Sequence, residues 1–215
     1  MTDDALTDTT RPARTTPSPS SLSFSARDLL NVAIFAVIYF VIVYAIAMIG
    51  IIGPLVMLLT LPLAVVAGGI PFLLFLTRVR HLGPVTLFGA VLGLLYLLLS
   101  GHPVVSTLLT LAVAAVADLI LWSRQYRSTW AAIWASTVFS LWFLGPWIPM
   151  LLNRAEYLNS PGMQMMGPEY VAAFDQIVSV QALTIYGFAT VVCGLLGGLL
   201  GTALLKKHFT RAGLA

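Results

Sequence analysis

Long hydrophobic runs without charged side chains alternate with short basic clusters along this chain. The first run covers the 49 residues 29–77. As an α-helix it would extend about 73 Å, whereas the hydrocarbon core of a bilayer is about 30 Å thick. The run therefore predicts two membrane crossings. The turn between them falls at 50–54, where two glycines relax the backbone and Pro54 suits the first position of a new helix.

The remaining hydrophobic runs extend this pattern to the C-terminal end. A charge-free stretch up to Ala117 is divided by a turn at 100–103, the run 128–153 is long enough for one crossing, and the last run ends at Lys206 and Lys207. These lengths predict an all-α, polytopic membrane protein with six transmembrane helices. We expect the helices at about 29–49, 54–77, 84–100, 103–122, 128–152 and 177–205.

The second predicted helix contains residues that disturb helices. Pro62, Gly68, Gly69 and Pro71 remove backbone hydrogen bonds or relax the backbone, so we expect kinks or breaks there. The segment 68–83 joins this disturbance to the first basic cluster of the chain. Its expected role is mechanical, as a bend and a basic cap.

The N-terminal region is polar up to the first crossing. Residues 1–24 are rich in Thr, Ser, Pro and Asp, which predicts a disordered cytoplasmic tail. A six-helix membrane domain then occupies 25–215. Ser25 and Asp28 have the spacing of a capping box, which satisfies free N–H groups at a helix start. They mark the beginning of the first helix.

The segment 153–176 is the long polar interruption of the membrane domain. At this length it is expected to have structure of its own. Pro168 suits the start of a short helix, in which Val171, Phe174 and Val178 would share one apolar face. We expect this segment to form an extracellular lid.

The positions of the basic side chains predict the orientation. Six crossings place both termini on the same side of the membrane. Ten basic residues fall on that side, and one, Arg154, falls on the other. By the positive-inside rule both termini are cytoplasmic. The ten are Arg11, Arg14, Arg27, Arg78, Arg80, Arg124, Arg127, Lys206, Lys207 and Arg211.

Composition supports the same class of protein. Hydrophobic residues make up 59% and charged residues 9%, with a mean hydropathy of +0.96, which excludes a water-soluble fold. The net charge of +3 does not indicate nucleic acid, because the basic residues form short clusters between hydrophobic runs rather than a stripe. The expected surroundings are a lipid bilayer, without a nucleic-acid partner.

Catalytic and metal-binding motifs do not accompany this pattern. The sequence has neither a Gly-x-Ser-x-Gly motif nor a P-loop, Cys193 is the one cysteine, and His102 has no partner at ligand spacing. We therefore expect no catalytic residues, no metal and no cofactor. Two alternatives stay open, namely a stand-alone membrane carrier or channel and an intramembrane enzyme whose residues come from separate helices.

Asp118 is the carboxylate that falls inside a predicted crossing. Ionisable groups at membrane depth are functional candidates, but a proton relay needs several of them. Asp118 lies about one turn from the cytoplasmic end of its helix, within reach of Arg124 or Arg78. We interpret Asp118 and Arg124 as a structural ion pair.

Small residues recur in the last predicted helix. Gly194, Gly197, Gly198 and Gly201 contain two overlapping small-xxx-small spacings, which let helices approach closely. Packing inside the bundle and homodimerisation both fit this pattern.

Aromatic residues gather at the predicted outer depth. Tyr44, Tyr96, Trp142, Trp147 and Tyr157 should lie there, either as an interfacial belt or as the wall of a small-molecule site. The irregular end of the fifth helix and the polar lid favour a site. The expected substrate-binding residues are Tyr96, His102, Trp142, Trp147, Asn153, Tyr157 and Gln181.

Several stretches of the sequence also resemble a known family. They are GGIPFLLFLTRVRHLG at 68–83, Gly-His at 101–102, ADLI at 117–120, FSLW at 139–142 and LLGGLLGTALLKKHFTRAGLA at 195–215. Together they resemble the MptD or Trep_Strep group of substrate-binding (S) components of energy-coupling factor (ECF) transporters. The resemblance covers about 25–215.

This resemblance implies a membrane protein that binds a vitamin-like micronutrient at the outer face of the bacterial cytoplasmic membrane. An S component docks on a transmembrane coupling subunit that carries two cytosolic ATPases, often through an Ala-x-x-x-Ala pattern on its first helix. Here that register has Ala33 and then Val37, with Ala36 one position early. The resemblance thus implies a docking face at these three residues.

Overall fold

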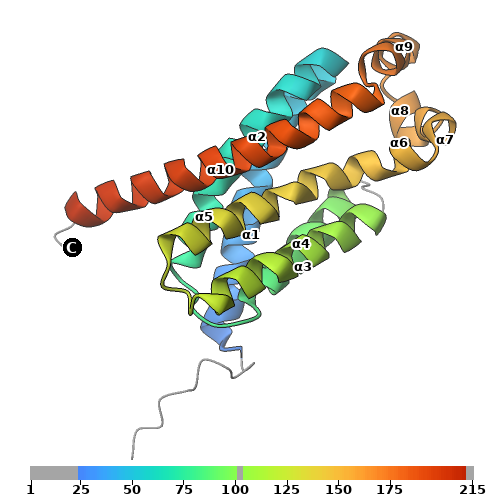
Figure 1. Cartoon of the computed structure of the whole chain (residues 1–215). Coiled ribbons are helices and arrows are strands. Elements are labelled where there is room, and N and C mark those ends of the chain that lie inside the picture. The colour runs from blue at the N-terminus through green and yellow to red at the C-terminus, as the bar shows by residue number, and fades with distance from the viewer. Residues whose placement is uncertain (1–23, 101–103, 212–215) are drawn as a thin grey trace, which may run out of the picture.

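The computed structural model describes residues 24–100 and 104–211 of the 215-residue chain. These residues form helices and turns, which confirms the all-α prediction (Figure 1). The predicted disordered tail at 1–24 falls almost entirely outside the described residues. The elements are α1 (Ala26–Met48), η1 (Ile49–Ile52), α2 (Pro54–Leu76), α3 (Pro84–Ser100), α4 (Val104–Ser123), α5 (Thr129–Ser140), η2 (Leu141–Trp147), α6 (Ile148–Leu152), α7 (Arg154–Leu158), α8 (Pro161–Gln164), α9 (Pro168–Ile177) and α10 (Val180–Arg211).

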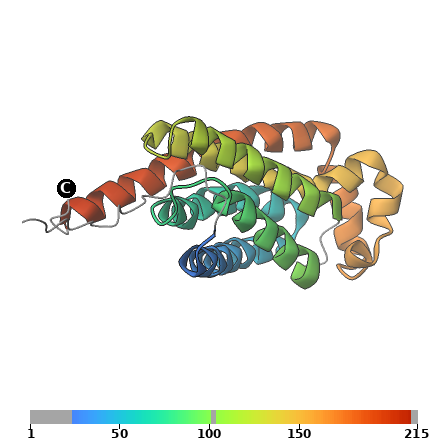
Figure 2. The same cartoon turned by 90° about the horizontal axis from the view of Figure 1, so that it is seen from below.

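Five helical segments of the described chain are long and apolar enough to cross a membrane, and α3 is a sixth, shorter apolar helix. The protein is therefore a polytopic membrane protein. The long helices form a closed ring in the order α1, α2, α10, α5, α4, α3, in which α3 returns to α1. Figure 2 shows the short helices α7–α9 gathered at one end of this bundle and the C-terminal end of α10 projecting at the other.

Aromatic rings fill the centre of the bundle. Tyr39, Phe72, Phe75, Phe88 and Phe139 are almost completely shielded from solvent. The rings of Phe72 and Phe139 stack with centroids 4.6 Å apart, and those of Phe75 and Phe88 lie 4.9 Å apart. Such contacts add to the stabilisation that burial supplies. This centre holds the helices that carry the site at the end of the bundle.

The first helix begins as its sequence predicts. The Ser25 side chain accepts a hydrogen bond from the Asp28 N–H at 3.2 Å, and the Asp28 carboxylate accepts one from the Ser25 N–H at 3.0 Å. This capping box starts α1 at Ala26 rather than at 29. The last helix differs more, because α10 begins at Val180 and continues to Arg211, beyond the predicted end at 205.

The second helix continues through Pro62 and Pro71, so neither proline breaks it. Gly69 has a different role from the one expected. A Cβ atom at this position would lie 2.6 Å from the carbonyl carbon of Gly197, so its absence lets α2 and α10 approach at backbone distance. A Cβ at Gly198 would likewise meet Ile133 of α5 at 3.2 Å. The predicted set of glycines, Gly194, Gly197, Gly198 and Gly201, therefore packs inside the bundle.

The predicted fifth helix is interrupted. The range 128–152 divides into α5, the 3₁₀ segment η2 and the short helix α6. Gly145 within η2 packs against α4, where an added Cβ would lie 2.9 Å from the Cα of Ser106. The side chains of Trp142 and Trp147 on this segment are buried.

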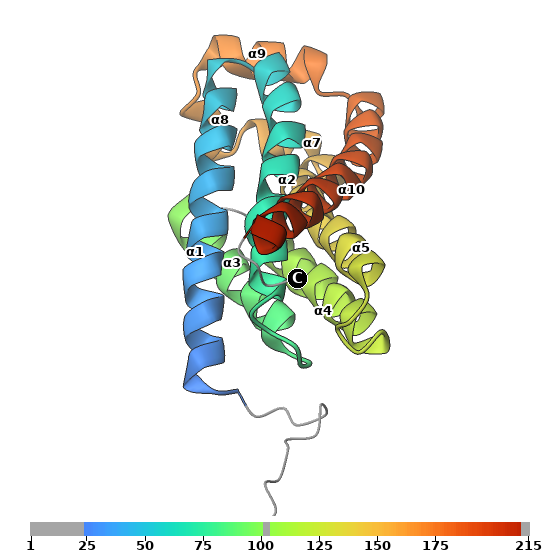
Figure 3. The same cartoon turned by 90° about the vertical axis from the view of Figure 1, so that its left-hand side faces the viewer.

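The segment 153–176 forms three short helices, α7, α8 and α9, and is called the lid segment below. The predicted short helix is confirmed, since α9 begins at Pro168, with Phe174 and Val178 buried. Figure 3 shows α9 lying across the ends of α1 and α2. The lid segment therefore closes one end of the bundle.

Candidate functional site

A cavity of about 280 Å³ lies beneath the lid segment and is called the lid cavity below. Its walls come from α1, η1, α2, α3, η2 and the lid segment. This volume is close to the lower end of the range for small-molecule sites. The lining residues are Val43, Tyr44, Ala47, Met48, Gly50, Ile51, Met57, Leu61, Tyr96, Trp142, Phe143, Pro146, Trp147, Tyr157, Met166 and Tyr170.

Four of the predicted substrate-binding residues meet at this cavity, namely Tyr96, Trp142, Trp147 and Tyr157. Tyr44, which was expected at the same depth, lines it as well. These five residues come from four different elements along the chain, α1, α3, η2 and α7. The outer aromatic residues are therefore more than an interfacial belt, because they surround one shared space.

The indole of Trp142 has a fixed orientation. Its Nε1–H donates a hydrogen bond to the Tyr39 hydroxyl oxygen at 3.0 Å. Its ring centroid lies 4.7 Å from that of Tyr96 and 4.3 Å from that of Phe143. Burial of these rings and the hydrogen bond leave little rotational freedom, so the aromatic wall is formed before a ligand binds.

Two other predicted residues that the structure describes do not line this cavity. Asn153 is exposed and caps α7, where its side chain accepts from the Glu156 N–H at 3.3 Å. Gln181 is exposed on the first turn of α10 and is not among the lining residues. His102 lies outside the described residues. A polar residue at the outer end was thus a poor indicator of the site, because polar residues also cap helices, as Asn153 does, or face solvent, as Gln181 does.

The lid segment adds aromatic residues of its own. Phe174 of α9 is buried, and its ring centroid lies 6.2 Å from that of Trp147 and 5.9 Å from that of Tyr157. Burial raises the pKa of Tyr157 and of Tyr170. Both phenols therefore stay neutral at physiological pH and can donate a hydrogen bond to a ligand.

A charged side chain joins the two ends of the lid segment to each other and to the residues just before α10. Arg154 Nε donates to Asp175 Oδ1 at 2.8 Å, and Arg154 Nη1 donates to the Val178 carbonyl at 2.8 Å. Bonds from one guanidinium to a carboxylate and a carbonyl fix geometry better than a lone surface ion pair. The beginning of α7 is thereby held against the end of α9.

Sequence reasoning missed several lining residues. Met48, Met57 and Met166 contribute flexible thioether side chains, and Tyr170 lies one turn before Phe174 on α9. The spacing of Tyr170 and Phe174 was a usable signal, because two aromatic residues one helical turn apart share a face. The methionines had no comparable signal in the sequence.

The predicted ion pair of Asp118 and Arg124 is replaced by a set of hydrogen bonds. The buried Asp118 carboxylate accepts from the Gly83 N–H at 2.8 Å, from the Thr86 hydroxyl at 3.0 Å and from the Tyr126 hydroxyl at 2.8 Å. Arg124 is exposed at the turn after α4. Because backbone and hydroxyl donors already satisfy the carboxylate, it does not need a cation. Burial and the Asp118 contact raise the pKa of Tyr126, which keeps it a donor.

The residues of the expected docking face separate on α1. Ala33 and Val37 are exposed, whereas Ala36 is completely buried with Val32 and Tyr39. Positions 33 and 37 are one helical turn apart, and position 36 lies on the side that packs against the bundle. Ala36 is therefore removed from the docking face.

The fold and the lid cavity define a multi-pass integral membrane protein with an aromatic cavity of small-molecule size at one end. Residues 26–211 match the family described as hypothetical bacterial integral membrane protein (Trep_Strep). The chain belongs to this family. No curated protein and no solved structure matches it.

Proposed function

We propose that this protein is the substrate-binding S component of an ECF-type importer in the bacterial cytoplasmic membrane. It captures a vitamin-like micronutrient in the lid cavity at the outer face. It delivers the ligand inward when docked on a transmembrane coupling subunit with two cytosolic ATPases. The observation that supports this most directly is a preformed aromatic cavity, closed by a lid segment, at one end of a six-helix membrane bundle.

The chemistry of the cavity lining limits the classes of ligand that would bind. None of the lining residues is charged, and the wall combines aromatic rings with methionine side chains. Polar contacts would come from the hydroxyls of Tyr44, Tyr96, Tyr157 and Tyr170. Such a site favours a flat, largely apolar molecule with a few hydrogen-bonding groups over a multiply charged one.

Energy for uptake would come from the partner ATPases. The proposal assigns no catalytic role to this chain, whose sequence has no P-loop. The exposed face of α1 around Ala33 and Val37 is the proposed contact with the coupling subunit. The small side chain of Ala33 would allow close helix–helix approach there.

Co-purification tests the proposal. The tagged full chain is expressed with candidate ECF coupling and ATPase subunits, and the complex is isolated in mild detergent. We expect a stable complex and ATP-dependent uptake in proteoliposomes. Absence of a complex, together with substrate uptake by the isolated chain alone, would establish a stand-alone carrier instead.

A matched pair of variants tests the docking face. Ala33→Trp places a large side chain on the exposed face of α1, and Ala203→Trp does the same at an exposed position of α10. We expect Ala33→Trp to reduce recovery of the coupling subunit while the retained ligand, measured by mass spectrometry, is unchanged. Equal recovery with both variants would remove this face of α1 from the interface.

A further inference from the structure

A second cleft, of about 700 Å³, lies at the end of the bundle away from the lid segment and is called the basic cleft below. It is formed by the C-terminal end of α2, the turn between α4 and α5, and the C-terminal end of α10. Four of its lining side chains are cationic, Arg78, Arg80, Arg127 and Lys206, and no carboxylate is among the lining residues. The other lining residues are Leu73, Leu74, Leu76, Thr77, Leu121, Tyr126, Ser128, Thr129, Ala132, Thr202 and Leu205.

The two described carboxylates nearest this end have other partners. Asp28 pairs with His81 Nε2 at 3.2 Å, and Asp118 is buried among the donors of α3 and Tyr126. The basic cleft therefore concentrates positive charge from three separate segments of the chain. Like charges held in one cleft repel each other, so an anion bound between them is stabilising.

Neutral donors reinforce the cationic lining. Ser128, which lines the cleft, caps α5 by accepting a hydrogen bond from the Ala131 N–H. The N-terminal end of α5, where the helix dipole is positive, therefore lies at the cleft. The hydroxyl of Thr129 adds another donor to the lining. A phosphate oxygen accepts from guanidinium, hydroxyl and backbone N–H groups alike.

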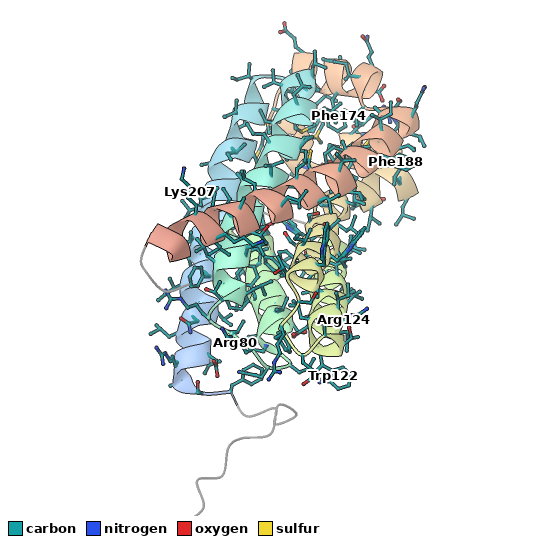
Figure 4. All side chains as sticks on the ribbon, turned by 60° about the vertical axis from the view of Figure 1, so that its left-hand side comes forward. Arg80, Trp122, Arg124, Phe174, Phe188 and Lys207 are labelled. Carbon is teal, nitrogen blue, oxygen red and sulfur yellow. The ribbon has the colours of Figure 1, made fainter. Side chains whose placement is uncertain are left out.

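The wall beside these donors is apolar. Leu74 of α2 is 40% exposed, and Leu205 of α10 is half-buried beside the same space. Three tryptophans at this end, Trp122, Trp130 and Trp134, are exposed at the depth where interfacial aromatic belts form. Figure 4 shows Trp122 with Arg80 and Arg124 at the end of the bundle away from Phe174. A bound anion there has hydrocarbon directly beside it.

We propose that the basic cleft binds the phosphate group of an anionic phospholipid of the cytoplasmic leaflet, with an acyl chain along Leu74 and Leu205. Phosphate alone would use the cationic half of the site and leave the apolar wall without a partner. A phospholipid uses both halves, which is why we assign the site to a lipid. This inference is independent of the transport function proposed above.

Native mass spectrometry and lipid titration test this site. The full chain in mild detergent is titrated with phosphatidylglycerol, with zwitterionic phosphatidylcholine and with inorganic phosphate. We expect tight binding of phosphatidylglycerol only, weakened by salt. Equal binding of phosphatidylcholine, or full competition by inorganic phosphate, would overturn the assignment to an anionic lipid.

Variants locate the binding in the cleft. The double variant Arg78→Gln/Arg127→Gln should lose phosphatidylglycerol affinity by about thirtyfold, since each basic side chain near an anionic headgroup contributes separately. Arg124→Gln is the matched control, because Arg124 is basic and exposed at the same end but does not line the cleft. An equal loss in both would overturn the site and indicate general surface charge.

A charge-preserving variant separates binding from folding. Arg78→Lys/Arg127→Lys keeps both charges and should retain most of the phosphatidylglycerol affinity, with thermal unfolding in detergent close to that of the natural chain. If the glutamine variant does not fold, the salt dependence of phosphatidylglycerol binding by the natural chain tests the proposal instead. Binding that is unaffected by salt would then contradict an anionic-lipid site.

Discussion

Single aromatic side chains connect the lid cavity to the centre of the bundle. Trp142 faces the cavity with its ring and donates its N–H to Tyr39, which is buried among Phe88 and Phe139. A change at Trp142 therefore affects both the cavity wall and the core. Trp147 is simpler, because it contacts Phe174 of the lid segment and Tyr186 of α10.

Truncation of these tryptophans should weaken ligand binding. We expect Trp142→Ala and Trp147→Ala each to reduce affinity by about tenfold or more, because each removes an aromatic wall of the cavity. Retained small molecule, quantified by mass spectrometry of gently purified protein, measures the effect. Trp134→Ala is the control, since this residue is exposed on α5 and away from the cavity. Unchanged retention in both cavity variants would exclude η2 from the site.

The hydrogen bonds of Asp118 predict a structural role for this residue. Its carboxylate is buried and accepts bonds from α3 and from Tyr126. Asp118→Asn turns one acceptor into a donor that faces other donors, so we expect a loss of about 1.5–3 kcal/mol in unfolding free energy. Thermal or denaturant unfolding in detergent measures it. Arg124→Gln should leave stability nearly unchanged. If Arg124→Gln and Asp118→Asn lost the same stability, the result would support an ion pair between Asp118 and Arg124 instead.

At the scale of elements, the contact between α2 and α10 depends on glycine. Gly69→Leu would force the two backbones apart at Gly197, so we expect a loss of about 1–3 kcal/mol, or failure to fold. Gly187→Leu is a matched control, because an added Cβ on α10 there meets nothing within 4 Å. Thermal unfolding of both variants in the same detergent gives the comparison. Equal stability of the two variants would mean that the backbones of α2 and α10 do not approach closely at Gly69 in solution.

Most elements could be predicted from sequence, because hydrophobic length and capping act locally. The capping box at Ser25, the start of α9 at Pro168 and the six apolar helices follow from such signals. The irregular end of the fifth helix was expected, but the packing of η2 against α4 could not be predicted. It depends on Gly145 meeting Ser106 of α4, which is a contact between distant parts of the chain.

Part of the candidate site could also be predicted from local signals, and part of it could not. Residue depth along a helix can be counted from sequence, and it placed Tyr96, Trp142, Trp147 and Tyr157 together correctly. The direction in which a side chain at a helix end points cannot be derived from sequence position, because it depends on helix caps and tertiary packing. Gln181 was therefore misplaced.

At the scale of the whole molecule, the lid cavity and the basic cleft lie at opposite ends, so orientation decides which compartment each one faces. The excess of basic residues predicts a cytoplasmic basic cleft and an external lid segment. In a Cys193→Ala background, Gly162→Cys on the lid segment should react with an impermeant thiol reagent in intact cells. Ser123→Cys at the other end should be protected until the cells are permeabilised.

Gly162 suits this experiment, because an added Cβ there meets nothing within 4 Å. Ser123 is exposed at the end of α4. The reverse pattern of labelling would invert the molecule in the membrane and move the lid cavity to the cytoplasm.

The bonds of Arg154 make the two edges of the lid segment unequal. On the α10 side, one guanidinium bonds to Asp175 and to the Val178 carbonyl. On the α1 side, the Tyr170 hydroxyl lies 3.4 Å from the Gly50 carbonyl oxygen, which is a long hydrogen bond. Arg154 thus joins α7 to the end of α9, whereas Tyr170 contacts η1 through one weak hydrogen bond. We therefore expect α7 and α9 to move together, rather than separately, when a ligand enters the lid cavity.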